Sequence, residues 1–563
     1  MEMEFLNRLE IKLKEIYGDK YRSSYIDSFK ELIELWSSFQ WKEVKPISEK
    51  SIYLITYGDS IYRENKPTLA SLHEFLNEKL AGIVTDVHVL PMFPYTSDDG
   101  FSVTNYREIQ PKLGNWENIE LLSKDYRLMF DFVANHISKE SRWFQGYLNG
   151  EETYQDYFIP KDDSFDTSKV VRPRTSPLYH QYQGKNGVKT AWTTFSEDQV
   201  DLNFSYFPLL LEMTDILLLY ASKGGTSIRL DAIGFIWKKS GTSSIHMPQA
   251  HAIIQLWRMI LDYLQPNTQI ITETNVPHQE NISYFGDGTN EANMVYQFSL
   301  PPLVLFALTT HNSKKLSNWA EKIGKVSDTS TFFNFLASHD GIGMRPVEGI
   351  LSEDEKELLV EKVKKNGGRI SYKNNPDGTK SVYELNINYS DALMNEEDIS
   401  EQMQVNKILA AHAILLSFIG VPAIYYHSIL GSRNDLRGVQ QSNINRRINR
   451  EKLELQAIIK ELGFDSRRKG IFEGLLDMIT IRKQEKSFSP YAEQEVLHLG
   501  GNVFSLRRFC EKSEEEILFV VNVDSQPITI PIPATGVDLW SRQEVEEQIR
   551  LNPYQFMWIK QNK

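Results

Sequence analysis

Hydrophobic and polar positions follow different rhythms in three parts of the chain. Up to residue 48, apolar residues such as Phe5, Leu9 and Leu13 recur every three or four positions, which predicts two amphipathic helices with a break near Gly18. From Ser51 onward, short apolar runs alternate with longer segments of helical spacing, a pattern typical of parallel β-sheets. After about residue 480 the helical spacing ends, and strand-like runs predict a small all-β domain.

Eight of the central apolar runs have the length of strands, and eight parallel strands are the number that closes a barrel. They lie at Ile52–Tyr57, Ile83–Leu90, Leu128–Val133, Ser227–Asp231, Gln269–Glu273, Asn293–Phe298, Phe332–Ala337 and Val421–Tyr425. The predicted fold class is therefore α/β, a (β/α)8 TIM barrel with long insertions after strands three and seven. The expected organisation is an N-terminal helical extension over 1–48, barrel segments over 49–133, 207–340 and 395–480, insertion domains over 134–206 and 341–394, and a C-terminal β domain over 481–563.

Composition and charge exclude several classes of function. With 563 residues, of which 41% are apolar and 24% charged, the chain has the composition of an ordinary globular protein. Its net charge of −13 repels nucleic acids and anionic membranes, so an anionic substrate would need a local basic pocket. Cys510 is the only cysteine, which excludes a disulfide framework, and no apolar run reaches the ~20 residues of a membrane span. Without a signal-peptide pattern, the chain is expected in the cytoplasm, with neither nucleic acid nor membrane as a partner.

Four carboxylates stand at or just after predicted strand ends, namely Asp131, Asp231, Glu273 and Asp340. The carboxyl ends of barrel strands carry the catalytic residues of this fold. Arg229 lies two positions before Asp231 and shares its face of the strand, where it can hold that carboxylate ionised and fix its orientation. Each carboxylate alone also fits a helix cap or a structural ion pair. Together they meet the need of glycosidic cleavage for two carboxylates flanking the bond.

These carboxylates belong to four motifs that resemble those of the α-amylase superfamily. The motifs are Asp131-Phe132-Val133-Ala134-Asn135-His136, Ile228-Arg229-Leu230-Asp231, Ile271-Thr272-Glu273 and Ser338-His339-Asp340. By this resemblance, Asp231 is the nucleophile, Glu273 the acid/base and Asp340 the stabiliser of the transition state. The residues that would line the glucose pocket are His136, Arg229 and His339. A lone histidine at such a rim is structural about as often as it is functional.

Further segments resemble the sucrose-phosphorylase-like branch of that superfamily. They are Ser97-Asp98-Asp99-Gly100-Phe101, Arg172-Pro173-Arg174, Ala232-Ile233-Gly234, Leu300-Pro301-Pro302-Leu303, Asp340-Gly341-Ile342-Gly343 and Gly420-Val421-Pro422. By the same resemblance, Asp98 and Arg446 would bind hydroxyls of the donor glucose, and Phe101 would stack nearby. The residues expected on the acceptor and phosphate side are Arg174, Tyr383 and Glu384. Arg172 and Arg174 also fit a solvated bend around Pro173.

Departures from the sucrose phosphorylase pattern point to a different acceptor. The helical extension, Asn275-Val276-Pro277-His278, Asn334–Ser338 and the loop Tyr372–Gly378 resemble glucosylglycerate phosphorylases instead. This resemblance implies reversible phosphorolysis of an α-glucoside, 2-O-α-D-glucosylglycerate, to α-D-glucose 1-phosphate and D-glycerate by double displacement. It implies a sugar substrate and inorganic phosphate as partners, no organic cofactor and no metal, and it leaves a homodimer open. Besides Arg174, further candidate donors to the acceptor carboxylate are Lys373, Asn374 and Asn375.

Three alternatives remain open from the sequence. The chain could phosphorolyse sucrose or sucrose 6'-phosphate, or it could hydrolyse α-glucosides. It could also be a catalytically inactive barrel that serves as a binding subunit. Intact Asp231, Glu273 and Asp340 count against the last alternative, although the fold alone would not exclude it.

Overall fold

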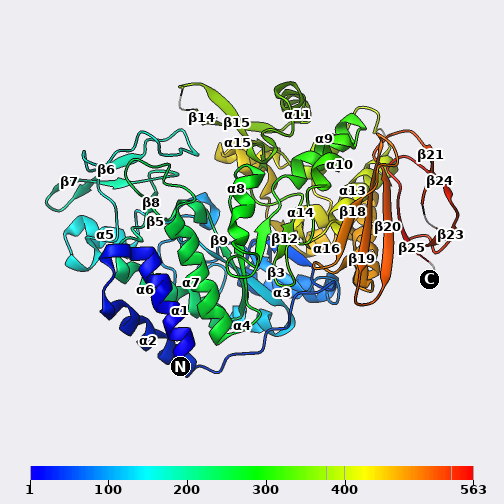
Figure 1. Cartoon of the computed structure of the whole chain (residues 1–563). Coiled ribbons are helices and arrows are strands. Elements are labelled where there is room, and N and C mark those ends of the chain that lie inside the picture. The colour runs from blue at the N-terminus through cyan, green and yellow to red at the C-terminus, as the bar shows by residue number, and fades with distance from the viewer. Residues whose placement is uncertain (1, 376, 399, 534, 562–563) are drawn as a thin grey trace.

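A closed eight-stranded parallel barrel forms the centre of the molecule in the computed structural model, which describes residues 2–375, 377–398, 400–533 and 535–561 (Figure 1). Position 376, in the predicted loop Tyr372–Gly378, lies outside the described residues. In spatial order the barrel strands are β1 (Tyr53–Thr56), β16 (Val421–Tyr425), β12 (Thr331–Asn334), β11 (Met294–Tyr296), β10 (Gln269–Thr272), β9 (Gly225–Leu230), β4 (Arg127–Phe132) and β3 (Asp86–Val89). All eight predicted strands, and with them the predicted fold class, are confirmed.

The barrel strands are buried along nearly their whole length, because side chains fill the interior and helices cover the outside. The helices between the strands and after the last strand are α3 (Thr68–Lys79), α4 (Trp116–Asp125), α6 (Phe207–Ser222), α7 (Pro248–Leu264), α8 (His278–Ile282), α9 (Leu300–Thr310), α10 (Lys314–Ala320), α13 (Glu401–Ser417), α14 (Tyr426–Ile429), α15 (Leu436–Ser442), α16 (Leu455–Phe464) and α17 (Ser466–Arg482). Among the described residues, none of the helices has the length and apolarity needed to span a bilayer.

Several strands end earlier than the apolar pattern predicts, and this places carboxylates at the rim. β9 ends at Leu230 and β10 at Thr272, so Asp231 and Glu273 are the first residues beyond their strands. Ala232 then adopts a left-handed φ of 48°, which ends the extended geometry directly after Asp231. The two side chains are therefore fixed by buried strands yet stand where the barrel opens.

The N-terminal extension consists of two helices that pack on the outer helices α6 and α7. They are α1 (Met3–Tyr17) and α2 (Ser23–Ser37). α1 ends at Gly18, whose φ of 52° suits glycine, as the sequence predicts. Phe5 stacks on Tyr263 with 4.2 Å between ring centroids, and Tyr25 stacks on Phe207 at 3.8 Å. The predicted two-helix extension is confirmed.

Two long segments interrupt the barrel after β4 and β12. The first contains β5 (His136–Ser138), α5 (Arg142–Asn149), β6 (Tyr179–Gly184), β7 (Gly187–Trp192) and β8 (Gln199–Asp201). The second contains β13 (Ile342–Gly343), α11 (Glu353–Lys365), β14 (Arg369–Asn374), β15 (Lys380–Asn386) and α12 (Tyr389–Leu393). A small parallel pair joins β2 (Ile61–Tyr62) to β17 (Leu453–Glu454). Both insertions supply side chains to the pocket described below.

The C-terminal part is a β-structure on the side of the barrel opposite the N-terminal helices (Figure 1). Its main sheet has the order β18 (Glu493–Val496), β19 (Val503–Cys510), β20 (Glu515–Asn522), β25 (Phe556–Gln561), β22 (Gly536–Asp538) and β23 (Glu544–Val545). A second antiparallel pair joins β21 (Ile528–Pro531) and β24 (Gln548–Leu551). This confirms the predicted C-terminal β-structure.

Candidate active site

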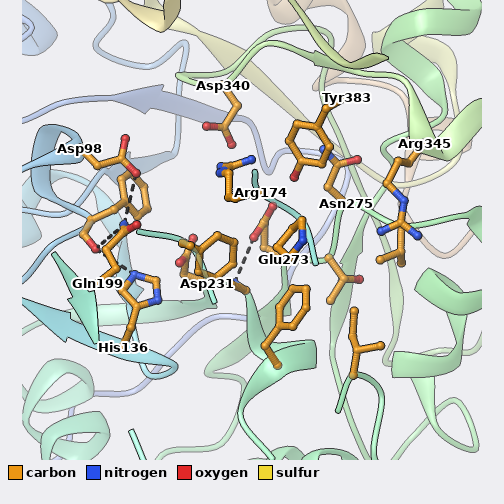
Figure 2. A pocket seen from close by; sticks show the side chains of 18 of the residues that line it. Asp98, His136, Arg174, Gln199, Asp231, Glu273, Asn275, Asp340, Arg345 and Tyr383 are labelled. Carbon is orange, nitrogen blue, oxygen red and sulfur yellow. Dashed lines mark hydrogen bonds between the residues drawn. The ribbon is translucent and has the colours of Figure 1, made fainter. Parts of the chain in front are cut away.

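A pocket lies at the carboxyl ends of the barrel strands, and side chains from both insertions help to line it. Ten of the predicted site residues line it, namely Asp98, Phe101, His136, Arg174, Asp231, Glu273, His339, Asp340, Tyr383 and Arg446. Figure 2 shows Asp98 and His136 at one end of the pocket, with Asp231 and Glu273 in its middle. Residues far apart in the sequence therefore converge on one cavity.

Arg229 lies beneath the pocket and holds the carboxylates in place. Its Nη1 contacts Asp131 and lies 2.8 Å from Oδ1 of Asp231. Its Nη2 lies 3.8 Å from Oε2 of Glu273. Register explains the arrangement, because Asp131 on β4 is the cross-strand partner of Arg229 on β9. The prediction that Arg229 and Asp231 share a face is confirmed, and contact with one guanidinium keeps the carboxylates of Asp231 and Glu273 close together.

The backbone after the nucleophile candidate adds a further restraint. The N–H of Ala232 donates a hydrogen bond of 3.1 Å to Oε2 of Glu273. A left-handed φ is uncommon for a residue other than glycine and typically occurs where the surrounding structure enforces it. The turn at Ala232 thus orients the Glu273 carboxylate toward its neighbour on β9.

Burial sets the protonation of the two central carboxylates. It raises the pKa of Asp231 to about 6, since loss of hydration outweighs the attraction of Arg229. Burial and the nearby charge of Asp231 likewise raise the pKa of Glu273 to about 7, again against the pull of Arg229. Arg229 therefore moderates the shift of Asp231 but does not lower its pKa below the ordinary value. The pKa of Glu273 is raised more than that of Asp231, so Glu273 retains its proton more readily, which suits a general acid beside a nucleophile.

One end of the pocket combines hydrogen-bonding groups with an aromatic surface. Nε2 of His136 lies 2.9 Å from the carbonyl oxygen of Phe101, and the Phe101 ring stacks on His339 at 4.8 Å. Burial lowers the pKa of His136, and it lowers that of His339 well below its usual range with help from nearby arginines. Gln199 donates to Oδ2 of Asp98 at 3.3 Å. Neutral imidazoles, a carboxylate and ring faces are the groups that bind sugar hydroxyls and the apolar face of a sugar ring.

A tight turn points the adjacent side chains of Asp98 and Asp99 in different directions. Asp98 and Asp99 have φ of 52° and 50°, so both residues lie in the left-handed region. Gly100 follows with φ of 114°, and a Cβ there would lie 2.7 Å from the carbonyl oxygen of Pro91, so only glycine fits. Asp98 lines the pocket, whereas Asp99 pairs with Arg450 at 2.7 Å. The turn therefore directs two adjacent carboxylates to different surroundings, one to the pocket and one to an ion pair in the scaffold.

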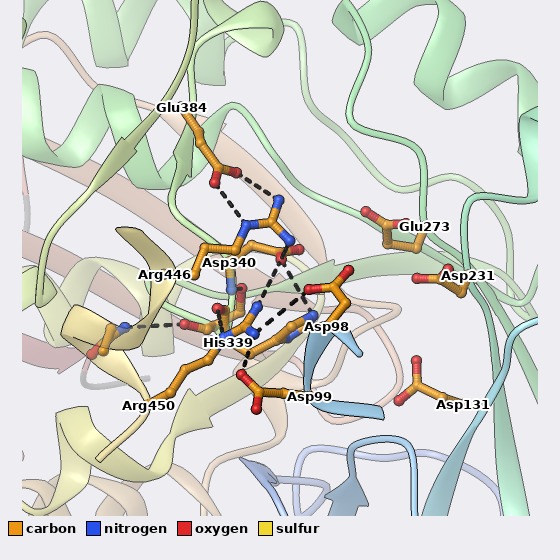
Figure 3. Close-up of polar contacts among 12 residues, drawn as sticks. Asp98, Asp99, Asp131, Asp231, Glu273, His339, Asp340, Glu384, Arg446 and Arg450 are labelled. Carbon is orange, nitrogen blue, oxygen red and sulfur yellow. Dashed lines mark hydrogen bonds and ion pairs between the residues drawn. The ribbon is translucent and has the colours of Figure 1, made fainter. Parts of the chain in front are cut away.

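Arg446 lies between two acidic side chains, Asp340 and Glu384, and contacts both (Figure 3). Its Nη1 lies 2.6 Å from Oδ1 of Asp340, while Nε and Nη2 bind Glu384 at 2.8 and 3.0 Å. Burial opposes ionisation of Asp340 and Glu384, yet Arg446 together with other nearby arginines lowers the pKa of both carboxyl groups. Asp340 therefore faces the pocket as a carboxylate near neutral pH.

Arg174 supplies positive charge beside this acidic group. Its guanidinium lies 5.0 Å from the centroid of the Tyr383 ring and 5.6 Å from that of Phe195. In the part of the chain that the structure describes, it forms no ion pair, so its charge is available to a ligand. Arg172, by contrast, donates to the carbonyl oxygen of Ser176 and does not line the pocket. The alternative that Arg172 and Arg174 are simply solvated side chains of a bend around Pro173 therefore fits neither residue.

Two residues predicted to contact the substrate do not line the pocket. Arg229 does not line the glucose pocket, because the barrel interior requires its charge to balance three buried carboxylates. Glu384 does not line the acceptor side, because Arg446 lies in front of it and binds both of its oxygens. Lys373, Asn374 and Asn375, suggested as further donors, lie at the end of β14 and in the loop after it, outside the pocket lining.

Sequence reasoning also missed residues that the fold brings into the pocket. Gln199 arrives from β8 of the first insertion and belongs to no motif. Asn275 was noticed only as a departure from sucrose phosphorylases, although it follows Glu273 at the end of β10. Arg345 lies two residues beyond the motif that ends at Gly343. The available signal for Arg345 was a positive charge close to the motif Asp340–Gly343 in a chain whose net charge is −13.

Comparison with known proteins first defines the class. The model of the alpha amylase catalytic domain matches residues 79–365. The structure superimposes on sucrose 6F-phosphate phosphorylase from Thermoanaerobacter thermosaccharolyticum with a TM-score of 0.74, at 23% identity, over 89% of this chain and 98% of that one. This likeness shows that the two proteins share the α-amylase-type barrel fold.

More similar relatives narrow the family. Glucosylglycerate phosphorylase of Spirochaeta thermophila is 44% identical over 529 residues, which cover 92% of this chain and 90% of the relative. Glucosylglycerate phosphorylase of Escherichia coli is 42% identical over 559 residues, covering 97% and 99%. The chain belongs to the α-amylase family, in the branch that contains these phosphorylases.

Proposed function

We propose that the chain is a retaining phosphorylase that transfers glucose reversibly between D-glycerate and inorganic phosphate. Its substrates are 2-O-α-D-glucosylglycerate and phosphate, and its products are α-D-glucose 1-phosphate and D-glycerate. The observation that carries this proposal is the pair Asp231 and Glu273, which follow neighbouring strands and contact one guanidinium, with the charge of Arg174 in the same pocket. The relatives named above support the choice of glucoside.

In the first step, Asp231 attacks the anomeric carbon while Glu273 donates its proton to the glycosidic oxygen. Glycerate leaves, and a β-glucosyl ester forms on Asp231. Asp98, His136 and His339 would hold the sugar hydroxyls, with the Phe101 ring stacked nearby. The negative charge of Asp340 would stabilise the positive charge that develops on the sugar ring.

In the second step, phosphate enters the space that glycerate has left. The ionised Glu273 accepts the phosphate proton, and a phosphate oxygen attacks the anomeric carbon and displaces Asp231. Two inversions return the α configuration. A phosphorylase must favour phosphate over water at this step, and the unpaired guanidinium of Arg174 is suited to bind it.

The pH dependence of glucoside cleavage should reflect the two carboxylates. We expect kcat/KM for glucosylglycerate to rise with pH through about 6, as Asp231 ionises, and to fall above about 7, as Glu273 loses its proton. In a ping-pong mechanism this parameter describes the first step, so ionisation of phosphate does not enter it. A profile without a decline between about pH 7 and 9 would remove Glu273 as the acid.

Replacement of Arg174 should weaken phosphate binding. Because a hydrogen bond to a charged group contributes roughly 1.5–3 kcal/mol, we expect Arg174→Ala to raise KM for phosphate about 10- to 100-fold. Hydrolysis of glucosylglycerate to free glucose should then gain relative to phosphorolysis, since water meets less competition. Initial rates over a range of phosphate concentrations measure both effects, and Arg172→Ala is the matched control because Arg172 lies outside the pocket. An unchanged phosphate KM would exclude Arg174 as the phosphate-binding residue.

The acceptor is tested in the direction of synthesis. Phosphate release from α-D-glucose 1-phosphate is measured with D-glycerate, glycerol, fructose and fructose 6-phosphate as acceptors. The proposal requires the highest kcat/KM with glycerate. A preference for fructose or fructose 6-phosphate would replace the proposal with a sucrose-type activity, and glucose formation without any acceptor or phosphate dependence would indicate a hydrolase.

A further inference from the structure

Among the described residues, an arginine whose guanidinium forms no hydrogen bond lies at the end of the pocket remote from Asp98. Arg345 follows β13 and lines the pocket. Within the described residues its guanidinium makes no hydrogen bond, and its Nε is buried without a partner. The nearest carboxylate oxygen belongs to Glu348, 3.9 Å from that Nε. A buried donor without a partner is costly, so a group that pairs with it on binding is expected.

An amide with unused hydrogen-bonding capacity lines the same pocket. Oδ1 of Asn275 is buried without a hydrogen-bond partner. Gly343, two residues before Arg345, gives this amide its room, because a Cβ there would lie 2.7 Å from Oδ1 and 3.0 Å from Nδ2 of Asn275. Among the described residues, neither Nε of Arg345 nor Oδ1 of Asn275 has a hydrogen-bond partner, so the two side chains together can bind a polar ligand group.

The local charge favours an anion at this site. Glu348 offsets part of the Arg345 charge, but Lys373 lies 3.6 Å from Glu348 on its other side. The three side chains together carry a net charge of +1 when all are ionised. Neither Glu348 nor Lys373 lines the pocket, so Arg345 alone presents this charge to a bound molecule.

The position of Arg345 distinguishes between the two anions of the proposed reaction. In Figure 2, Arg174 lies next to Asp340 and Glu273, whereas Arg345 lies beyond Tyr383 and Asn275 at the far side. Phosphate must reach the anomeric carbon beside Asp231, where Arg174 is the nearer cation. The carboxylate of glycerate is attached to the carbon that bears the glycosidic oxygen, and it therefore extends away from the sugar.

We propose that Arg345, assisted by Asn275, binds the carboxylate of the acceptor and makes the enzyme select a carboxylated polyol over neutral ones. This inference rests on the proposed function and refines it. It assigns two tasks to two arginines, with Arg174 serving phosphate and Arg345 serving the acceptor. Arg345 is a specificity-determining residue, and it takes no part in proton transfer.

The test compares two acceptors in the synthetic direction with α-D-glucose 1-phosphate as donor. For Arg345→Gln we expect KM for D-glycerate to rise roughly 10- to 100-fold, while KM for glycerol changes less than about threefold. Since Arg345 does not touch the reacting atoms, kcat with saturating glycerate should stay within about threefold of the wild type. Arg172→Gln removes an arginine that does not line the pocket and should leave both KM values unchanged. Arg345→Lys keeps the positive charge but not the planar guanidinium, so its KM for D-glycerate should lie between those of the wild type and Arg345→Gln. It replaces Arg345→Gln in the test if that variant does not fold.

The outcomes separate this inference from the proposed function. If the wild type uses glycerate well but Arg345→Gln leaves KM for glycerate unchanged, or raises it equally for glycerol, the assignment of Arg345 is wrong and the proposed function stands. If the variant raises KM for phosphate in the reverse direction and not that for glycerate, Arg345 binds phosphate instead. If the wild type itself does not use glycerate, the proposed function fails and the inference falls with it.

Discussion

Asp231→Ala is expected to lower kcat/KM for phosphorolysis of glucosylglycerate on the order of 10⁴-fold or more. Without the carboxylate no covalent glucosyl intermediate can form, so the double displacement is lost. The variant should fold, because Asp131 and Glu273 still balance the buried charge of Arg229. Initial rates of glucose 1-phosphate formation measure the loss, and far-ultraviolet circular dichroism confirms the fold.

Azide provides a sharper test of the role of Asp231. In Asp231→Ala, azide can enter the space of the missing carboxylate and attack an activated donor, α-glucosyl fluoride, from the β face. The expected product is β-glucosyl azide, which no enzyme with an intact nucleophile would form. Near-normal phosphorolysis by the variant, or an α-azide as its product, would contradict the assignment.

Glu273→Gln is expected to lower kcat/KM for glucosylglycerate about 10²- to 10⁴-fold, since an amide cannot donate the proton that the leaving alkoxide needs. The effect should almost vanish for α-glucosyl fluoride in the first step, because fluoride leaves without protonation. Azide should then attack the glucosyl ester on Asp231 and give α-glucosyl azide, the opposite anomer from that of Asp231→Ala. Equal losses with the glucoside and the fluoride would exclude Glu273 as the general acid.

Glu273→Gln should not lower the stability of the fold above neutral pH. The folded state raises the pKa of Glu273 to about 7, well above its value in an unfolded chain. A raised pKa contributes stability that is present below the unfolded pKa and is lost as pH rises through about 7. The glutamine variant avoids this loss, so its melting temperature at pH 8 should equal or exceed that of the wild type. A lost activity in that variant therefore cannot be ascribed to unfolding.

Much of the central site could be predicted because it follows from local pattern. Short apolar runs located the barrel strands, and the spacing of Arg229 and Asp231 fixed their common face. The contacts of Arg229 with Asp131 and Glu273 could not be predicted from the chain, because they depend on which strands become neighbours when the barrel closes. The same holds for the pKa values, which depend on burial more than on the neighbouring residue in sequence.

The acceptor side was less predictable because insertions build it. Asp98 and Asp99 diverge through left-handed turns that their sequence alone does not reveal. Glu384 was expected to face the acceptor, but a long side chain from another part of the chain, Arg446, reaches it first. Nothing in the sequence around Arg345 except its charge predicts a site residue. Only the fold shows that Arg345 lines the pocket and that its Nε has no hydrogen-bond partner among the described residues.

The most direct test of the account follows the anomeric centre and the phosphate together. Glucosylglycerate is incubated with the wild-type enzyme, with and without inorganic phosphate, and proton and phosphorus NMR spectra are recorded from the first minutes. We predict α-D-glucose 1-phosphate and glycerate as the early products, formed in equal amounts and at a rate that depends on phosphate. The appearance of β-glucose 1-phosphate, or of free glucose at a rate independent of phosphate, would contradict a retaining phosphorylase.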